Sequence, residues 1–515
     1  MPIAVGRNSP NSYRIESITI TNNEGNSYEV SNLMQSFQIT ESIYQMFITG
    51  SMTFTDSMNI FNKIGFTGQE YIRIHIGGIQ GYESIVPHEQ RIDQTFRIFN
   101  VSNHVRSIEN PVLQIYRVEF CSPLLYLART QRISQAFRGK TGDILNKICF
   151  DKLNFQEKPI KKTGQANRPN AQKPRVKGGQ ALGNFFSVFE SGVGDVNGMI
   201  IPNWSVFKTL RWLRDNTSDN TEEWGDSYYF YQTCMDGFKF HSIESMRKIE
   251  YLGGQITFAP RMSGGDENFN YDVKDGVGND ILAYNKSNTY NVLDSHLHGT
   301  YGGNIQVFDP KTKLLMTVPS QFEQQFPIVD SGDKKGQYKN KKKHFAVAPS
   351  FRFGAENIKI PPDGGIAGEE MPPIDADIPM DGITEATGAA VSFNYNNPYT
   401  FSQGVNVSGH SVSYATEVNK FNRERAEKLL ENNRMNIQIS GRTNISAGQT
   451  INIQLLQPTP TTEAREELTH NGRMLVEGIT WIGTEDGLET QLTVATDGHQ
   501  VNMDTFFNHE GSQQY

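Results

Sequence analysis

Two glycine-containing segments have the residue types that bind phosphate groups in other proteins. Arg138-Gly139-Lys140-Thr141 matches the closing half of a phosphate-binding loop. A complete loop also needs a glycine five positions before Gly139, and Ser134 stands there. The second segment, Gly192-x-Gly194-x-x-x-Gly198, has one residue too many for the dinucleotide-binding pattern. We interpret the first segment as a turn at the start of a helix and the second as a flexible turn, and we expect no cofactor.

Two further segments have metal-ligand residue types. Asp375-x-Asp377-x-x-x-Asp381-Gly382 is similar to a calcium loop, but Pro379 stands where a ligand oxygen is needed. His296-x-His298 would place two imidazoles on one face of a strand, with Asp294 as the nearest third ligand. A solvated acidic loop and a polar strand face explain these patterns more simply, so we expect no metal site.

Residues for nucleophilic catalysis do not form a recognisable pattern. The three cysteines, Cys121, Cys149 and Cys234, are unclustered, and we interpret them as reduced, partly buried thiols. The chain has no Gly-x-Ser-x-Gly segment. A pair of carboxylates for glycoside hydrolysis stays open, because such pairs meet in space and not in sequence. We predict no catalytic residue and a protein that is not an enzyme.

The charge of the chain does not favour nucleic-acid binding. The 515 residues include 48 Lys and Arg against 56 Asp and Glu, a net charge of −8. Two basic stretches, 158–177 and 334–343, lack interleaved stacking aromatics apart from Tyr338, so we expect them to dock an acidic partner surface. The start of the chain lacks a secretory h-region, and the longest apolar cluster, Leu124–Ala128, is far shorter than the roughly 20 residues that span a bilayer. We expect no membrane insertion.

The elements that must position any site are mostly strands. After a polar tail (1–12), apolar residues alternate from residue 13 to 121, as in Ile72-x-Ile74-x-Ile76, and predict an antiparallel β domain. The apolar face shifts between Ile98 and Phe99, and again between Ile115 and Tyr116, so we predict a β-bulge or a strong bend of the strand at each place.

The pattern changes after Pro123 to that of a mixed α/β domain, 122–245. Helical spacing covers 124–137, 143–153 and 203–214, and strand-like sequence covers 228–240. Between them, the basic and proline-containing stretch 157–179 predicts a mobile loop.

A second β domain is predicted from 246–315 and 405–498. A Pro/Gly-rich insertion, 316–404, interrupts it, a helix covers 418–433, and a polar tail, 499–515, ends the chain. The predicted fold class is therefore mainly β with α/β additions, with two β domains that could be similar in structure without visible sequence identity.

Three groups of residues, in this order along the chain, resemble the central baseplate hub protein of T-even-type contractile-tailed phages, which is related to the hub part of type VI secretion spike proteins. The first group resembles the first tube domain of that family, the second its mixed domain and the third the return half of its second tube domain. They are Ser42-x-Tyr44 with Gly50-x-Met52-x-Phe54-x-Asp56-Ser57-x-Asn59-Ile60 and Gly68-x-Glu70-x-Ile72; Asn203-Trp204-x-Val206-Phe207-x-x-Leu210-x-x-Leu213; and Arg423-Glu424-Arg425-Ala426, Gly448-x-x-Ile451-x-Ile453 and Val476-x-x-Ile479-x-Trp481. In the first group, we expect Asp56-Ser57 to cap a short segment, Met58 to Ile64, that the glycine turn at Gly65 to Gly68 follows.

The resemblance implies two tube-type antiparallel β-barrel domains and a structural role in the virion. Three copies would form a ring that is pseudo-sixfold toward the tail tube and threefold toward the central spike, with a channel through which DNA passes without specific binding. The implied partners are two further copies of the chain, the tail tube or tube-initiator protein, the spike protein, the tape-measure protein and baseplate wedge proteins. The implied location is the tail baseplate, assembled in the host cytoplasm from late proteins.

The loop 157–179 and the insertion 316–404 have no counterpart in the resemblance, which leaves other functions open. One alternative is a tail-associated cell-wall hydrolase or polysaccharide depolymerase, with Glu369, Glu370 and Asp381 as residues to test. Another alternative is a tail protein that binds a host receptor.

Overall fold

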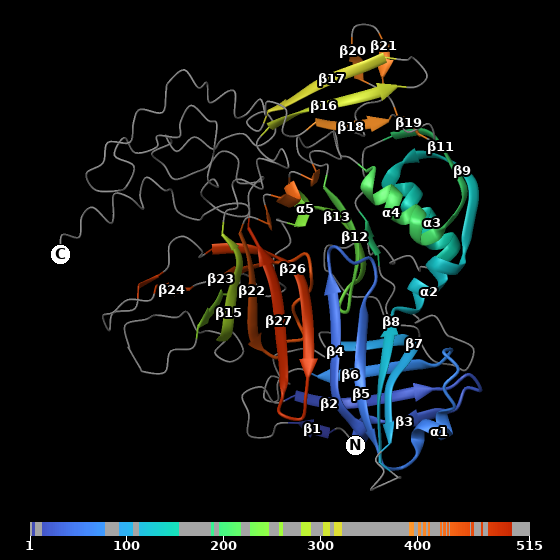
Figure 1. The fold of residues 1–515 in the computed structure, drawn as a ribbon, viewed down its shortest axis with the longest axis vertical. Helices are drawn as coiled ribbons and strands as arrows, with labels where there is room; N and C mark the ends of the chain where they lie inside the picture. Colours follow the sequence, from blue (N-terminus) through green and yellow to red (C-terminus); the bar gives the residue numbers. More distant parts are fainter. Residues whose placement is uncertain are drawn as a thin grey trace, which may run out of the picture.

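The computed structural model of the chain is mainly β, as the sequence predicts, and three of its helices, α2, α3 and α4, lie together beside the strands (Figure 1). It describes residues 3–5, 13–77, 92–106, 113–153, 187–189, 195–217, 227–246, 257–260, 280–289, 302–309, 314–321, 391–395, 400–402, 405–407, 410–412, 423–424, 426–428, 430–431, 433–453, 455–457, 465–466 and 472–496.

A 14-stranded sheet contains two sets of six strands each. The first set pairs in the order β2-β6-β7-β8-β5-β4 and also carries β1 and β3 on β2. Its strands are β1 (Ile3–Val5), β2 (Tyr13–Thr21), β3 (Ser27–Glu29), β4 (Met34–Ser42), β5 (Thr49–Asp56), β6 (Tyr71–Gly77), β7 (Ile92–Arg106) and β8 (Gln114–Cys121).

The second set pairs in the order β14-β23-β26-β27-β22-β15, and β15 pairs with β14 again, so that the pairings form a closed circuit. Its strands are β14 (Thr257–Pro260), β15 (Asp280–Thr289), β22 (Asn433–Ser440), β23 (Thr450–Ile453), β26 (Gly472–Gly483) and β27 (Leu488–Ala495). The two sets join where β4 pairs antiparallel with β26 (Figure 1).

Both sets have the same strand order. Counted along the chain within each set, the order is first, fourth, fifth, sixth, third, second. The four pairings from the fourth strand to the second are antiparallel in both sets, whereas the first strand pairs antiparallel in one set and parallel in the other.

A β-bulge recurs at the same place in the fifth strand of each set. Arg97 of β7 pairs with both the fourth and the sixth strand, and the register shifts one residue later, between Ile98 and Asn100. Leu475 of β26 likewise pairs with both the fourth and the sixth strand of its set, and the register shifts between Val476 and Gly478. The bulge predicted at Ile98–Phe99 is therefore confirmed, and it belongs to a repeated feature.

The second strands share a bulge as well. The β4–β5 register shifts between Met34 and Ser36, and the β15–β22 register shifts between Ile281 and Ala283. The bulge predicted between Ile115 and Tyr116 is wrong, because β8 alternates through both residues and simply exposes Ile115. The register shift opposite them lies in β7.

The turn before the fourth strand is held in the same way in both sets. The carboxylate of Glu70 accepts the backbone N–H of Thr67 at 2.6 Å, and the side-chain carbonyl of Gln449 accepts that of Ser446 at 3.1 Å. The backbone carbonyls of Glu70 and Gln449 then accept the N–H of the bulge-preceding residue of the fifth strand, at 3.0 and 2.8 Å.

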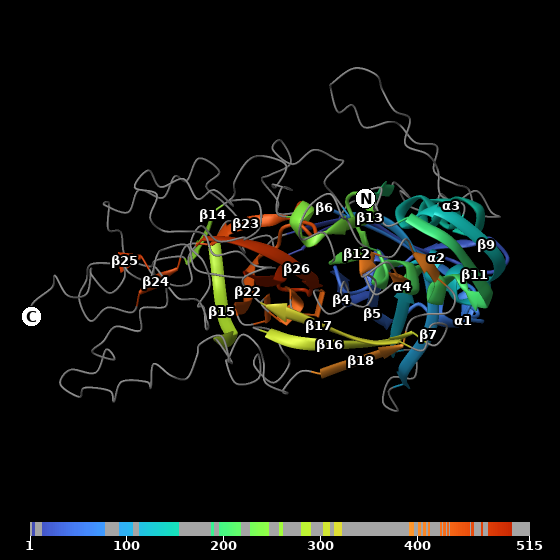
Figure 2. The same cartoon turned by 90° about the horizontal axis from the view of Figure 1, so that it is seen from above.

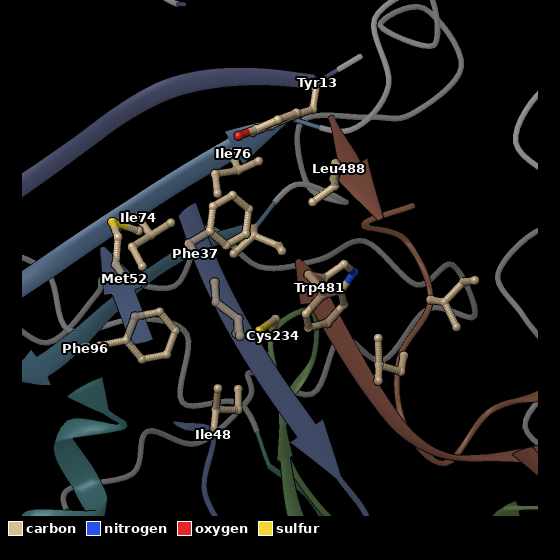
Figure 3. Packing of buried hydrophobic residues seen from close by; sticks show 14 of the residues in the cluster. Tyr13, Phe37, Ile48, Met52, Ile74, Ile76, Phe96, Cys234, Trp481 and Leu488 are labelled. Atoms are coloured by element: carbon tan, nitrogen blue, oxygen red, sulfur yellow. The ribbon is translucent and has the colours of Figure 1, made fainter. Parts of the chain in front are cut away.

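One apolar core runs through both sets. Phe37 of β4 lies between Met52 and Ile74 on one side and Trp481 of β26 on the other (Figure 3). Since these side chains are all buried, the alternation of the strands in both sets is explained by a shared interior.

The mixed region packs its helices against two three-stranded sheets, one of which takes its third strand, β19, from the distant 400–402 segment. Its elements are α2 (Pro123–Thr130), β9 (Arg132–Lys140), α3 (Thr141–Leu153), β10 (Ser187–Phe189), β11 (Asp195–Ser205), α4 (Val206–Asp215), β12 (Tyr228–Thr233), β13 (Gly237–Ser242) and α5 (Ile243–Met246).

The helix predicted over 124–137 is wrong in its second half. The i, i+4 pair Ile133 and Phe137 fits a helix and a strand equally well, and pairing of β9 with β11 decides for the strand. The helix predicted over 203–214 begins only at Val206, because the hydroxyl of Ser205 caps it by accepting the Lys208 N–H. The cap predicted at Asp56-Ser57 is wrong in position, because α1 spans only Ile60–Ile64 and its N-cap is Asn59. The Asp56 carboxylate still accepts the N–H of Met58 and of Phe61 in the first turn.

A separate three-stranded sheet, β17-β16-β18, lies beyond the mixed region (Figure 1). Position 316, the expected start of the insertion, falls inside β17, and the described residues from 423 to 431 are helical, with β22 beginning at Asn433. The remaining strands are β16 (Gly302–Asp309), β17 (Leu314–Gln321), β18 (Val391–Tyr395), β19 (Thr400–Ser402), β20 (Val405–Val407), β21 (His410–Val412), β24 (Leu456–Gln457) and β25 (Arg465–Glu466). Of the helices described, none combines the length and the apolar character needed to cross a membrane.

Candidate assembly site

The junction between the two strand sets is a continuous antiparallel pairing of β4 with β26. It runs from Phe37 opposite Gly483 to Ser42 opposite Gly478. In the middle of the junction the hydroxyls of Thr40 and Thr480 are hydrogen-bonded at 3.2 Å. This pairing covers the edge of β4 with a strand that lies more than 430 residues later in the chain.

Aromatic packing closes one end of the junction. The Phe37 ring lies directly over Gly483, where any Cβ atom would overlap it, so only glycine allows this approach. Tyr13 meets Phe37 edge-on, and its hydroxyl donates to the Thr484 carbonyl at 3.1 Å. Phe37 is 2% exposed as a result.

A charged cluster closes the other end, at the β26 bulge. The buried Glu477 carboxylate binds the Arg434 guanidinium at 2.6 and 3.1 Å and accepts the Tyr44 hydroxyl at 2.6 Å. Its backbone carbonyl accepts the Ile43 N–H and the Ser42 hydroxyl at 2.9 and 3.1 Å. The Tyr44 side chain is 38% exposed, but its hydroxyl lies against the buried Glu477 carboxylate. Burial of that hydroxyl, and then the Glu477 charge, raise the pKa of Tyr44 well above its ordinary value, so that it remains a donor.

Glu41 connects the junction to the mixed region. Its carboxylate accepts the N–H of Cys234 at 2.7 Å and of Ala447 at 2.8 Å, so it joins β4, the β12–β13 turn and the loop before β23. Burial raises the pKa of Glu41 to about 7, against the opposing effect of the two N–H groups.

Among the described residues, each strand set also has one edge that no other strand pairs with. On the side opposite β22, no described strand pairs with β15 beyond Ile281. On the β6 side, no described strand pairs with β7 beyond Ile98, although the ring of His104 near its end stacks on Phe61 at 4.2 Å. Four of the nine large apolar side chains that are exposed in the described part of the chain lie on these two strands: Phe99, Val105, Leu282 and Tyr284.

The structure describes Gly139 and the three cysteines, which are among the residues that the sequence suggested for phosphate binding or nucleophilic catalysis. Gly139 has φ +117° and turns the chain from β9 into α3, which begins at Thr141, in agreement with a turn at a helix start. Burial raises the pKa of Cys121 to about 11 and those of Cys149 and Cys234 well above their ordinary value, so thiolate is scarce at neutral pH. Among the described residues, no group of three or more His, Cys, Asp or Glu could hold a metal ion.

Other candidates lie outside the described residues. They are Gly192 and Gly194, Asp294, His296 and His298, the segment Asp375–Gly382 with Glu369 and Glu370 before it, and the basic stretches 158–177 and 334–343; Gly198 lies in β11.

Sequence reasoning found the strands of the junction but not the junction. The alternations Phe37-x-Ile39 and Ile479-x-Trp481 are visible in the sequence, yet nothing in either strand specifies the other as its partner. A signal that could have helped is Gly483, because a glycine at the end of an alternating strand often marks close approach by another group.

No protein-family model and no curated protein matches the chain. Among solved structures, it is similar to the tail protein from Neisseria meningitidis MC58, at 8% identity and TM-score 0.45 over 93% of this chain and 96% of that one. The 43 kDa tail protein of prophage MuSo2 from Shewanella oneidensis gives 8% identity and TM-score 0.45 over 94% and 100%. The Francisella PdpA-VgrG complex is similar at 10% identity and TM-score 0.40, over 94% of this chain and 58% of that one. At these values the likeness assigns no role to the chain.

Proposed function

We propose that the chain is a structural baseplate hub protein of a contractile phage tail, in which three copies form a ring. The observation that carries the proposal is the repeated strand set. Each chain holds two six-strand sets of one order, so three chains supply six similar sets. In such a ring the six strand sets are related by sixfold pseudosymmetry, and the regions present once per chain are related by threefold symmetry.

That combination adapts one symmetry to another. The six strand sets would face the sixfold tail tube or its initiator protein, and the regions present once per chain would face the threefold central spike. The mixed region and the β16–β18 sheet occur once per chain, which supports this division. The tape-measure protein and the baseplate wedge proteins complete the proposed set of partners.

The ring would leave a channel for DNA ejection, in a virion baseplate assembled in the host cytoplasm. DNA must pass through without specific binding, because phosphate contacts with Lys and Arg would slow its transit. A closed ring of this kind needs no catalytic residue, no metal and no cofactor, and we propose that the chain has none.

The test is the mass of the purified protein in solution, measured by light scattering over a range of concentrations. We expect a species near three times 58.0 kDa. As a control for activity, a zymogram on peptidoglycan should show no clearing. A strict monomer that clears peptidoglycan, and stops doing so after Glu369→Gln or Asp381→Asn, would replace the hub with a hydrolase.

A further inference from the structure

We infer that β15 of one copy pairs antiparallel with the second half of β7 of another copy, in the register that β4 and β26 adopt within one chain. This inference rests on the proposed function, because it names the contact that would close the ring. Three observations support it: β15 and β7 are equivalent to β4 and β26, they carry exposed large side chains, and they lie on opposite sides of the β4–β26 junction.

The first step is the equivalence of the strands. β15 is the second strand of its set, as β4 is of the first, and both carry a bulge at their start. β7 is the fifth strand of its set, as β26 is of the second, with a bulge one residue after Arg97 and Leu475 respectively. The chain therefore contains one second-to-fifth junction, β4 with β26, and the unused halves of another.

The second step compares equivalent side chains. The pairings place Tyr284 of β15 at the position of Phe37, and Phe99 of β7 at the position of Glu477. Phe37 and Glu477 are 2% and 1% exposed, whereas Tyr284 and Phe99 are 41% and 54% exposed. The large side chains are thus buried in the β4–β26 junction and exposed at the equivalent positions of β15 and β7. Exposed large apolar side chains of this kind are typical of a protein–protein interface.

The third step concerns the partner. β15 and β7 lie on opposite sides of the β4–β26 junction in both Figure 1 and Figure 2. The two edges therefore cannot pair within one chain, and a second copy supplies each with what it lacks. The contact is head-to-tail, and such contacts generate a ring when the rotation closes.

The register follows from the same equivalence. Thr40 and Asn288 hold the same position, since each pairs with the equivalent residue of the third strand, Thr49 or Arg434. Ser102 and Thr480 both lie five residues after the shared starting point in the fifth strand. We therefore place Asn288 of one copy opposite Ser102 of the next.

The strands also match just beyond this pair. β15 carries an additional bulge between Lys286 and Asn288, and β7 one between Ser102 and Val105. In the inferred register the two bulges lie opposite each other, so neither interrupts the pairing alone.

The chemistry of the new junction differs from that of the existing one. Thr49 stands at the position of Arg434, and Phe99 at that of Glu477, so the ion pair of the β4–β26 junction has no counterpart. The contact between copies is consequently apolar at this point, and its strength should depend little on salt.

The decisive experiment is disulfide trapping in the full-length protein. We expect Ser102→Cys combined with Asn288→Cys to give covalent dimers and trimers on mild oxidation, and an equimolar mixture of the two single variants to give dimers. Thr40→Cys with Thr480→Cys is the matched control, which should form a disulfide within one chain and stay monomeric in denaturing gels. Val101→Cys with Asn288→Cys is one residue out of register and should not cross-link. The native cysteines are buried and should not contribute.

A second readout uses assembly itself. Tyr284→Asp and Phe99→Asp should each lower the trimer fraction at least tenfold in light scattering, whereas Ile200→Asp, at another exposed apolar residue, should not. A trimer that forms without the cross-link, or cross-linking of Ser102→Cys with itself, would overturn the inference and leave the proposed ring standing. A monomer at every concentration that also gives no cross-link would contradict both.

Discussion

At the scale of single residues, the junction between the strand sets contains two buried carboxylates that are stabilised differently. Glu477 has an Arg434 guanidinium as counter-charge, whereas Glu41 has two backbone N–H groups. A buried ion pair compensates for lost hydration only when its geometry is good and further hydrogen bonds are made, as the Tyr44 hydroxyl does for Glu477.

Glu41 should make the folded protein less stable as the pH rises. Its pKa is about 7 in the folded protein, against an ordinary value of 4.5, so between these values the folded chain holds a proton that the unfolded chain has released. The free energy of unfolding should fall as pH rises through this window, by at most about 1.4 kcal/mol per pH unit. Urea midpoints at pH 4.5, 5.5, 6.5 and 7.5 measure this.

Glu41→Gln should remove that pH dependence. It should also lower the free energy of unfolding by about 1–3 kcal/mol at pH 5, because the amide NH2 then faces one of the two N–H donors. Glu24→Gln, at an exposed turn, is the control and should leave both the midpoint and its pH slope unchanged. An unchanged slope in Glu41→Gln would show that another group titrates.

Arg434→Met should destabilise the junction by about 3–5 kcal/mol, because it leaves the Glu477 charge buried without its counter-ion. The double variant Arg434→Met/Glu477→Gln removes that charge and should recover most of the loss. A double-mutant cycle on urea midpoints measures the coupling. If the double variant is as unstable as the sum of the two single variants, the pair is not coupled.

At the scale of elements, the sequence predicts strands better than their partners. Alternation predicted the six strands of the first set and the bulge at Ile98–Phe99, because burial on one face is a local pattern. The strand β9 was not predicted, since Ile133 and Phe137 have helical spacing and only β11 decides their state. The β4–β26 junction was not predicted for the same reason. Strands pair through backbone N–H and C=O groups, which are the same in all strands, so the local sequence does not specify the partner.

The two equivalent turns offer a test of the repeat. Gln449→Ala should lower the free energy of unfolding by about 1–3 kcal/mol, because it leaves the N–H of the buried Ser446 without its acceptor. Glu70→Gln should lower it less, because Thr67 and Gly68 lie in an exposed turn, where water can replace the lost acceptor. Ser17→Ala, in β2, is a control for a substitution within a strand. Thermal unfolding followed by far-UV circular dichroism compares the four proteins. If only one of the two variants is destabilised, the two turns share a hydrogen-bonding pattern but differ in how much they stabilise the fold.

At the scale of the whole molecule, assembly should stabilise the fold by mass action. If the open edges of β15 and β7 are covered only in the ring, the midpoint of thermal unfolding should rise with protein concentration. Tyr284→Asp should abolish that dependence and leave the low-concentration midpoint unchanged, because the side chain is exposed within its own chain. Differential scanning calorimetry over a hundredfold range of concentration measures this, with Ile200→Asp as the control. A midpoint independent of concentration in the native protein would contradict it.

The covalent link between the two strand sets changes the thermodynamics of ring formation. Six separate units would need five association steps to form the ring, and each step loses translational and rotational freedom worth about 4–15 kcal/mol at a 1 M standard state. Because the β4–β26 junction forms within one chain, half of the junctions in the proposed ring involve no such loss. Three of the six contacts are in effect made at the high local concentration that a tether provides. The ring can therefore close at dilutions where six identical single-set proteins would remain apart.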